Sequence, residues 1–470
     1  MLSSPVLRWL PAVVLLAAGC TAVGPQYTPP QLTPPERWTR VDDARFDSTR
    51  RAELAEWWRQ LHDPALSALV EAALTANYDL KRALASVREA RARRLLASAE
   101  YFPTLSLSVD ASRAKAGRRT GGSGGGTSEL YSAGFDASWE PDVFGGVRRG
   151  VEAAQADLEA SEASFDDARV SLTAEVALNY VELRAFQARL GIARVNLDTQ
   201  TETFRITEWR AQAGLVGALD VEQARASLEQ TRAQIPILET GRVQAEHRLA
   251  VLIGQAPAAL AEQLAIPAAI PSTPDRVAIG IPADTLRQRP DVRVAERRLA
   301  AQTARIGQSE AARYPSLALS GSIGLEAFTL SGLGASGAAA QTIAARIAQV
   351  IFDAGRLREQ VEIQSALAAQ ALAAYEGAVL TALEDVENAL VALARSRERA
   401  AALRTAADAA RNAALLARQR YESGLIDFLT VLDTQRTVLS IEDNLASTEA
   451  DSASALIQLY KALGGGWSTL

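Results

Sequence analysis

The sequence predicts a mostly α-helical protein that carries two β-hairpins of membrane-spanning length and is built from two copies of one unit. Three observations lead to this prediction. Short motifs recur at a nearly constant offset, residues 147–213 and 356–423 contain no proline and read as very long helices, and each half holds a segment of two-residue alternation. Abundant alanine and an aromatic content of only 6% favour closely packed helices.

The first residues read as a targeting segment. The apolar stretch from Trp9 to Gly19 is shorter than the roughly 20 residues that a transmembrane helix needs. Small residues lead directly to Cys20, the only cysteine, as in a bacterial lipoprotein signal peptide. We therefore expect residues 1–19 to be removed, Cys20 to be acylated, and residues 20–56 to form an extended lipidated segment. The alternative is an ordinary secretory signal with an incidental cysteine.

The chain reads as a duplication of a domain-sized unit. Arg210 and Gly214 recur 210 positions later as Arg420 and Gly424. This period is far longer than that of solenoid repeats. The expected parts are a first repeat over 57–256, a proline-rich linker over 257–283, a second repeat over 284–464 and a tail over 465–470.

Each unit is expected to hold one β-hairpin, at about 103–141 in the first and about 315–352 in the second. In the first hairpin, apolar and polar residues alternate along two limbs of about ten residues, the length of a tilted membrane-spanning strand. The outgoing limb of the second hairpin alternates as well. Its return limb, roughly Gln341 to Phe352, alternates poorly and is expected to be a strand mainly because of the duplication.

Two long helices are expected after each hairpin. As a helix, the segment 147–213 would be ~100 Å long, and 356–423 repeats it. Apolar residues of the second segment follow a heptad seam made of Val379, Leu383, Val386, Leu390 and Leu393. Helices this long and this poor in apolar residues cannot form a globular core, so we expect them to pack as coiled coils.

The composition argues against several classes of function. The net charge is −6 without a basic patch, which argues against nucleic-acid binding. Because Cys20 is the only cysteine, disulfides within the chain are impossible, and His62 and His247 cannot supply a multi-histidine metal site. Nucleophile, base and metal-binding residues do not cluster in the sequence. We therefore expect no enzyme, no catalytic residue, no metal and no cofactor.

Four strands are too few for a membrane barrel, for which about eight is the minimum. An open sheet would leave unpaired backbone groups facing lipid. Oligomerisation would solve this problem: three protomers would supply twelve strands, and the helices would continue the barrel as a tube away from the membrane. The pattern indicates an outer-membrane protein without setting the number of protomers. A soluble periplasmic coiled-coil scaffold is the alternative, which the alternating strand pairs disfavour.

Four groups of motifs mark a family. They are Gly19-Cys20 followed by Val23-Gly24-Pro25 and Tyr27; Trp57-Trp58 with Leu61, Asp63 and Pro64; Arg289-Pro290-Asp291-Val292-Arg293 with Glu296; and Arg420-Tyr421-x-x-Gly424 leading to Leu429-Thr430-x-x-Asp433-x-Gln435-Arg436. With these motifs the sequence resembles the outer-membrane efflux protein family of TolC-type channels, most closely its OprM/NodT-like lipoprotein branch. The resemblance covers nearly the whole chain.

The resemblance implies a homotrimer whose twelve-stranded β-barrel, with four strands per protomer, is continued by a long periplasmic α-helical barrel. It implies an exit duct in the cell outer membrane, in contact with outer-membrane lipid. This duct would receive drugs or small amphipathic compounds from a periplasmic adaptor (a membrane fusion protein) and an inner-membrane pump of the RND type. A duct for type I polypeptide secretion is the alternative, because the same architecture serves both and the channel sequence does not define the cargo.

The family closes at its periplasmic tip, and the motif match places Leu429 and Asp433 at the constriction. The two residues are four positions apart and hence on one helix face. Three copies would form an apolar plug and a carboxylate ring that favours cations. The alternative is a solvated aspartate beside a core leucine. Candidate latch residues are Arg420, Tyr421 and Glu422, and candidate adaptor contacts are Gly214, Leu215, Val216, Gly424, Leu425 and Ile426.

Overall fold

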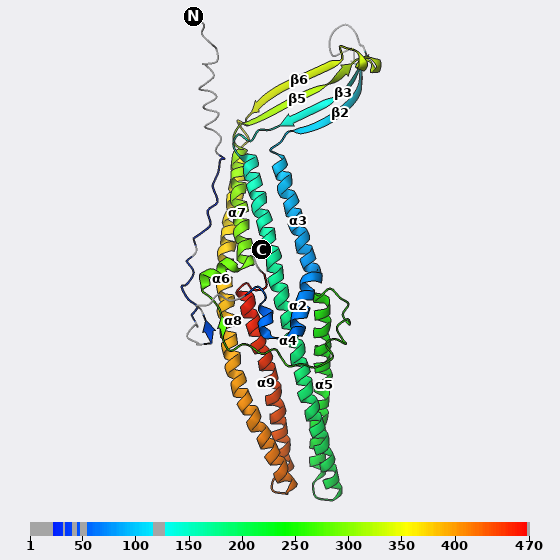
Figure 1. Ribbon diagram of the computed structural model, residues 1–470, viewed down its shortest axis with the longest axis vertical. Helices are drawn as coiled ribbons and strands as arrows, with labels where there is room; N and C mark the ends of the chain where they lie inside the picture. The colour runs from blue at the N-terminus through cyan, green and yellow to red at the C-terminus, as the bar shows by residue number, and fades with distance from the viewer. Residues whose placement is uncertain (1–21, 32, 40–44, 48–53, 116–126, 468–470) are drawn as a thin grey trace. The chain divides into compact units, whose positions relative to one another are not determined.

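A computed structural model describes residues 22–31, 33–39, 45–47, 54–115 and 127–467, so the predicted signal peptide and Cys20 lie outside the described residues (Figure 1). The chain forms two compact units. The sheet unit comprises Met1–Gln31, Ser86–Glu162 and Val294–Glu376, and the helix unit comprises Leu32–Ala85, Ala163–Arg293 and Gly377–Leu470. Four helices continue along the chain from one unit into the other: α3 (Tyr78–Ala99), α4 (Gly146–Gln212), α7 (Pro290–Ala311) and α8 (Arg356–Glu422).

The sheet unit holds four antiparallel strands in the order β2-β3-β5-β6. They are β2 (Thr104–Lys115), β3 (Thr127–Trp139), β5 (Ser316–Ala327) and β6 (Ala339–Ala348), with the short 3₁₀ turn η3 (Leu330–Gly334) between the last two. The two hairpins predicted from the alternating pattern are therefore present and lie side by side. Within the described residues, β2 and β6 are the edges of this sheet, and each pairs on one side only.

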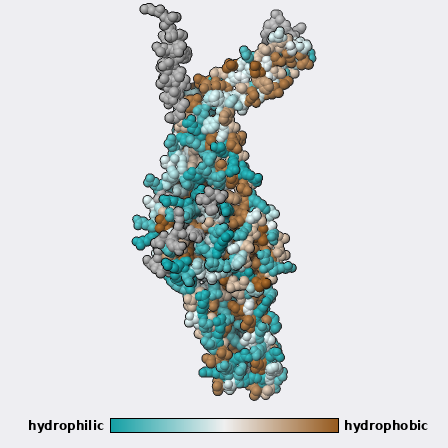
Figure 2. Space-filling model, in the orientation of Figure 1, coloured by the Kyte–Doolittle hydropathy of each residue, from teal (hydrophilic) through white to brown (hydrophobic). Residues whose placement is uncertain are grey.

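The register gives the sheet one mostly apolar and one mostly polar face. Leu107, Phe135 and Ile323 pair in one row, and Leu105 begins another that ends at Ile343. The opposite face holds the row Ser106, Asp136, Ser322 and Thr342. Figure 2 shows hydrophobic side chains gathered over the strands. Alternation between a lipid-facing and a water-facing side is the pattern of a transmembrane barrel strand.

The return limb of the second hairpin is shorter than expected. We expected a strand from about Gln341 to Phe352, whereas β6 begins at Ala339 and ends at Ala348. The reason lies in the turn that follows. The Asp353 carboxylate accepts hydrogen bonds from the backbone N–H groups of Gly355 and Leu357, each at 2.9 Å, and thereby caps α8. The chain has left the extended conformation before this cap forms.

The long helices repeat with equal lengths. The helices α4 and α8 each have 67 residues, and the helices that follow them, α5 (Ala218–Leu252) and α9 (Phe428–Ala462), each have 35. The predicted duplication and the two very long helices are therefore confirmed. The heptad seam of α8 faces the core, since Val386 and Leu393 are fully buried. This burial explains why an alanine-rich helix needs large apolar residues at those positions.

The helix that precedes each hairpin is divided in two, which the sequence pattern did not predict. In the first repeat α2 (Pro64–Ala76) is followed by α3, because the Asn77 side chain accepts hydrogen bonds from the backbone of Asp79 at 2.8 Å and Leu80 at 3.1 Å and starts a new helix. In the second repeat α6 (Pro282–Gln288) ends before Pro290, which opens α7.

The main hydrophobic core lies in the helix unit and explains the tryptophan motif. Trp57, in the 3₁₀ turn η2 (Trp57–Leu61), is fully buried and stacks on Tyr460 of α9 with ring centroids 5.4 Å apart. Asp63 caps α2 and accepts a hydrogen bond of 2.7 Å from the Tyr180 hydroxyl of α4. Burial, together with this bond, raises the pKa of Tyr180 to about 12. The same unit contains the two-residue parallel bridge between β1 (Phe46–Asp47) and β4 (Val277–Ala278).

Arg289, from the third motif, joins three helices of this unit. Its side chain is only 10% exposed and bonds both carboxylate oxygens of Asp291, at 3.0 and 2.6 Å. It also bonds Asp385 of α8 at 2.9 Å and the backbone carbonyl oxygens of Ala382 and Ala462. The ends of α7 and α9 are thereby fixed against the middle of α8.

Candidate functional site

The predicted site residues gather at two hairpin turns of the helix unit, between α4 and α5 and between α8 and α9 (Figure 1). Both turns have the same backbone. Gly214 and Gly424 adopt φ angles of +70° and +74°, where glycine is favoured. In each turn the next residue, Leu215 or Leu425, donates its N–H to a carbonyl five residues back, at 2.8 and 2.9 Å. This pattern ends a helix in a Schellman motif.

The two turns present equivalent side chains to solvent. Leu215 is 68% exposed and Leu425 is 73% exposed, whereas Val216 and Ile426 are half-buried. An exposed leucine at the same position of each turn is an unusual use of a large apolar residue, because burial of such side chains is favourable. The pair is therefore suited to contact another protein.

A small apolar cluster lies just behind the α8–α9 turn. Tyr421 of α8 and Phe428 of α9 are buried with ring centroids 5.5 Å apart. Val431, Leu432 and Ala224 complete the buried set. The Tyr421 hydroxyl is buried and, in the part of the chain that the structure describes, has no hydrogen-bond partner. Such an unsatisfied group costs about 1–3 kcal/mol, so the packed state of this cluster carries a cost.

Arg210 ties the end of α4 to the end of α8. Its guanidinium carbon lies 4.4 Å from the centre of the Tyr421 ring, and its Nη1 donates to the Tyr421 carbonyl oxygen at 3.2 Å. A cation over an aromatic face is attractive, more so when partly desolvated. The contact therefore combines a cation–π interaction with a hydrogen bond at one residue.

Two further contacts join the same helices. Arg418 of α8 pairs with Glu202 of α4 at 2.9 Å and with Glu422 of its own helix at 3.1 Å. Gln435 of α9 donates to the Thr203 hydroxyl of α4 at 3.0 Å. With Arg210 and Tyr421, these residues form what we call the tip lock, a set of contacts between α4 and the α8–α9 hairpin.

The remaining predicted residues have distinct surroundings. Leu429 is 55% exposed and Asp433, one turn further along α9, is exposed as well. Arg420 is exposed, and Glu422 is engaged with Arg418. The lipidation candidate Cys20 lies outside the described residues. Leu429 and Asp433 thus remain available for contacts outside the protomer.

Sequence reasoning missed the α4 side of the tip lock. The motifs do not mark Arg210, Glu202 or Thr203, although Arg210 is the repeat counterpart of Arg420. That offset was the available signal, because equivalent positions of a duplicated unit occupy equivalent turns. Arg420 itself is exposed, whereas Arg210 lies over the Tyr421 ring, so the two copies of this arginine have different surroundings.

In residues 22–467, leaving aside the undescribed gaps, no three or more His, Cys, Asp or Glu side chains are placed to hold a metal ion.

The four strands have one mostly apolar and one mostly polar face, and within the described residues their sheet is open at β2 and β6. Together with the two long helical hairpins, these features define a subunit of an outer-membrane channel. The profile of the outer membrane efflux protein family matches residues 69–255 and 281–465, once in each half. The chain is 32% identical to Nodulation protein T of Rhizobium leguminosarum bv. trifolii, over 97% of both chains. It is 33% identical to the pyoverdine export outer membrane protein OpmQ of Pseudomonas aeruginosa, over 92% of this chain and 91% of that one.

Among solved structures, the outer-membrane channel OprN superposes with a TM-score of 0.91 and 38% identity, covering 95% of this chain and 99% of that one. The chain belongs to the outer membrane efflux protein family. It is an outer-membrane efflux channel that extends into the periplasm, and its relatives are transport proteins.

Proposed function

We propose that the protein is the exit duct of a tripartite efflux system, formed by a lipid-anchored homotrimer. The duct passes drugs or small amphipathic compounds from a periplasmic adaptor and an inner-membrane pump of the RND type to the exterior. The relative OpmQ carries pyoverdine export in its name, which supports a small-molecule cargo over a secreted polypeptide.

The observation that carries closure by several protomers is the four-stranded sheet with one mostly apolar face, whose edges β2 and β6 each pair on one side only within the described residues; the number three follows from the resemblance to the family. A lipid-exposed edge is not viable because each unsatisfied backbone group costs several kcal/mol. Pairing the β6 edge of one protomer with the β2 edge of the next closes the sheet. Three copies give twelve strands, comfortably above the minimum of about eight.

The gate is proposed at Leu429 and Asp433. Both side chains are exposed in the protomer and follow each other on one face of α9. Around a threefold axis, three leucines would exclude water and three carboxylates would favour cations. Arg420 and Glu422 are the proposed latch toward a neighbouring protomer, and the tip lock with Tyr421 holds the hairpins within one.

The adaptor contacts are proposed at the two turns. Leu215 and Leu425 are the exposed apolar residues there, and Gly214, Val216, Gly424 and Ile426 set the shape of the turns. An anchor residue of this kind inserts into an apolar pocket of a partner. Acyl chains on Cys20 would anchor each protomer in the outer membrane.

Planar-bilayer conductance of the purified full-length protein, with its mass measured in the same detergent, tests the proposal. We expect a mass about three times that of one chain and a small, cation-preferring conductance. Asp433→Ala should enlarge the conductance and the leak of large solutes, because the charged ring is lost. Asp451→Ala removes an exposed carboxylate further along α9 and should change neither. A monomer without conductance would contradict the duct, and an unchanged Asp433→Ala channel would contradict the gate.

A further inference from the structure

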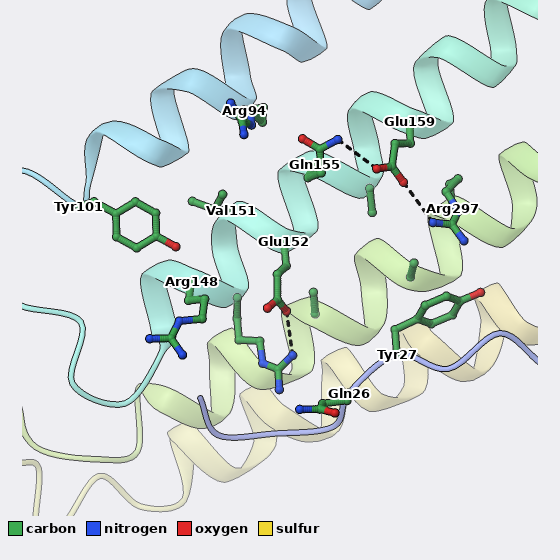
Figure 3. A pocket seen from close by; sticks show the side chains of 14 residues that line it. Gln26, Tyr27, Arg94, Tyr101, Arg148, Val151, Glu152, Gln155, Glu159 and Arg297 are labelled. Carbon is green, nitrogen blue, oxygen red and sulfur yellow. Dashed lines mark hydrogen bonds and ion pairs between the residues drawn. The ribbon is translucent and has the colours of Figure 1, made fainter. Parts of the chain in front are cut away.

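The N-terminal segment from Ala22 to Tyr27, which we call the strap, binds the helices of the sheet unit. The Val23 N–H donates to the carbonyl oxygen of Phe144 at 3.1 Å, in the turn between β3 and α4. Tyr27 donates its hydroxyl to Glu296 of α7 at 3.0 Å, and Arg297 lies 5.6 Å from the Tyr27 ring centre. Figure 3 shows Tyr27 beside Arg297, where strap residues line a cavity of about 530 Å³.

Arg149 of α4 binds the strap backbone through two hydrogen bonds. Its side chain is 5% exposed, its Nε donates to the carbonyl oxygen of Val23 at 3.1 Å, and its Nη2 donates to that of Gly24 at 3.2 Å. Glu152, one turn along α4, holds the remaining side of the guanidinium at 2.7 Å. A planar guanidinium offers donors in a fixed fork, which suits two successive carbonyl groups.

Three glycines make room for this contact. Gly24 adopts a φ of +86°, and a side chain there would collide with the backbone of Gly307 on α7. A Cβ on Gly145 would lie 2.5 Å from that of Ala22, and one on Gly307 would lie 2.9 Å from both Arg149 Nε and the Val23 carbonyl oxygen. These are closer approaches than any side chain tolerates, so the strap fits only against bare backbone.

Gly307 is the most informative of the three. It lies inside the helix α7, where glycine is unfavourable relative to alanine, in a chain that uses alanine freely. Gly307 therefore weakens α7 at the position where both the Val23 carbonyl oxygen and Arg149 come close to the helix backbone. Optimal packing of α7 alone does not account for this choice, whereas seating of the strap does.

We propose that Arg149, Gly145 and Gly307 form a seat that holds the strap and thereby fixes the level of the lipid anchor. The proposal rests on acylation of Cys20, proposed above. Cys20 lies three positions before Val23, so the acylated residue stays within ~11 Å of it. The seat thus places the acyl chains beside the turn that follows β3, where the strands meet the helices.

Aromatic residues mark the same level of the sheet unit. Phe144 and Tyr314 stack with ring centroids 4.9 Å apart, and the Trp139 indole donates to the Tyr101 carbonyl at 3.0 Å. Aromatic side chains of barrel proteins concentrate at the membrane–water interface. Acyl chains that begin at this level enter the hydrocarbon region without stretching the strap.

The seat is tested in the full-length, acylated protein with a spin label on Thr28→Cys, the only free thiol once Cys20 is acylated. In the parent the label should be immobilised. Arg149→Met and, independently, Gly307→Val should each raise the mobile fraction at least threefold. Arg305→Met is the matched control, because Arg305 joins the same two helices through Asp157, and it should leave the label immobilised.

The level of the anchor is tested in cells supplied with a photoactivatable fatty acid, followed by mass spectrometry of the cross-linked peptides. The parent should cross-link within residues 139–146, and Arg149→Met should lose at least half of this yield. Immobilised labels in both seat variants would overturn the seat, and an unchanged cross-linking pattern would overturn its role in placing the anchor. If mass spectrometry shows Cys20 to be unmodified, the label is read in a Cys20→Ser background, where Thr28→Cys is again the only thiol. An immobilised label there would leave the seat standing, reject acylation, and so overturn the anchor role.

Discussion

Arg289 shows how a single buried cation can organise several helices. Burial alone would lower its pKa, but the carboxylates of Asp291 and Asp385 outweigh burial and raise the pKa above its ordinary value. The guanidinium therefore stays charged, and each of its hydrogen bonds is charge-assisted. Lysine could supply the charge but not the fork that reaches Asp291, Asp385 and two carbonyl groups together.

Replacing Arg289 with methionine should destabilise the helix unit. The variant leaves two carbonyl groups and two carboxylates without their donor, which should cost about 2 kcal/mol because the carboxylates are partly exposed and can be solvated. Thermal unfolding followed by circular dichroism would show a lower midpoint. Arg404→Met, which breaks only the exposed pair with Glu449, should stay within about 0.5 kcal/mol of the parent. Equal midpoints for both variants would contradict this role.

Arg210 is the residue of the tip lock with the clearest expected phenotype. In Arg210→Met both the contact with the Tyr421 ring and the hydrogen bond to its carbonyl are lost, while the apolar stem is kept. The resting conductance should rise several-fold in planar bilayers. Arg205→Met, which removes a cation from the Trp209 ring on the same helix, should leave it unchanged. A resting conductance equal to that of the parent would show that the lock does not restrain the tip.

At the scale of elements, the beginning of α9 depends on one carboxylate. Asp427 accepts hydrogen bonds from the Thr430 side chain at 2.5 Å and from the Thr430 N–H at 3.0 Å. These bonds lower the pKa of Asp427 below its ordinary value of 3.8. A group with a depressed pKa in the folded state stabilises it fully above 3.8 and loses that effect as the pH falls through the folded-state pKa.

Asp427→Ala should therefore loosen the first turn of α9 at neutral pH. Hydrogen exchange at residues 428–431 should accelerate, and the difference from the parent should shrink as the pH is lowered below 3.8. Asp451→Ala, in the interior of the same helix, should leave exchange at 428–431 as in the parent. A difference that persists undiminished at acid pH would mean that the ionised cap is not its cause.

The helices also show what a sequence can and cannot predict. The absence of proline and the heptad seam predicted α4 and α8 to within about one residue at each end, because helix formation depends on local sequence and on one apolar stripe. The break at Asn77 depends on side-chain capping, and the early end of β6 depends on the Asp353 cap. Contacts such as Arg210 on Tyr421 join residues 211 positions apart and follow from packing between helices. Leu429 and Asp433 were predicted by motif matching. That both side chains are exposed depends on how the helices pack and could not be predicted from the motif.

At the scale of the whole molecule, the two faces of the sheet make different demands on a side chain. Ile343 lies on the apolar face of β6 and is 95% exposed in the protomer, while its neighbour Thr342 lies on the polar face that also carries Arg346. The alternation predicted from the sequence thus becomes, through the register, a distinction between lipid and lumen.

Arginine at these two positions should behave oppositely. Ile343→Arg places a charge on the lipid face at a cost of about 2–4 kcal/mol near the bilayer midplane, so the amount of assembled trimer in outer-membrane fractions should fall sharply. Thr342→Arg should assemble as the parent does and alter only ion selectivity. Native electrophoresis of membrane extracts measures the first effect and bilayer recordings the second. Equal losses for both variants would contradict the assignment of the faces.

The unpaired edges of β2 and β6 have a consequence for the life of the chain before it assembles. A protomer with two open strand edges and a mostly apolar sheet face is prone to aggregate. Between secretion and assembly it therefore has to be sheltered by holdase chaperones or be degraded by quality-control proteases. The relative rates of assembly and proteolysis therefore set the abundance of the protein. Substitutions that only slow assembly will appear as a lower amount of protein, even when every channel that does form conducts normally.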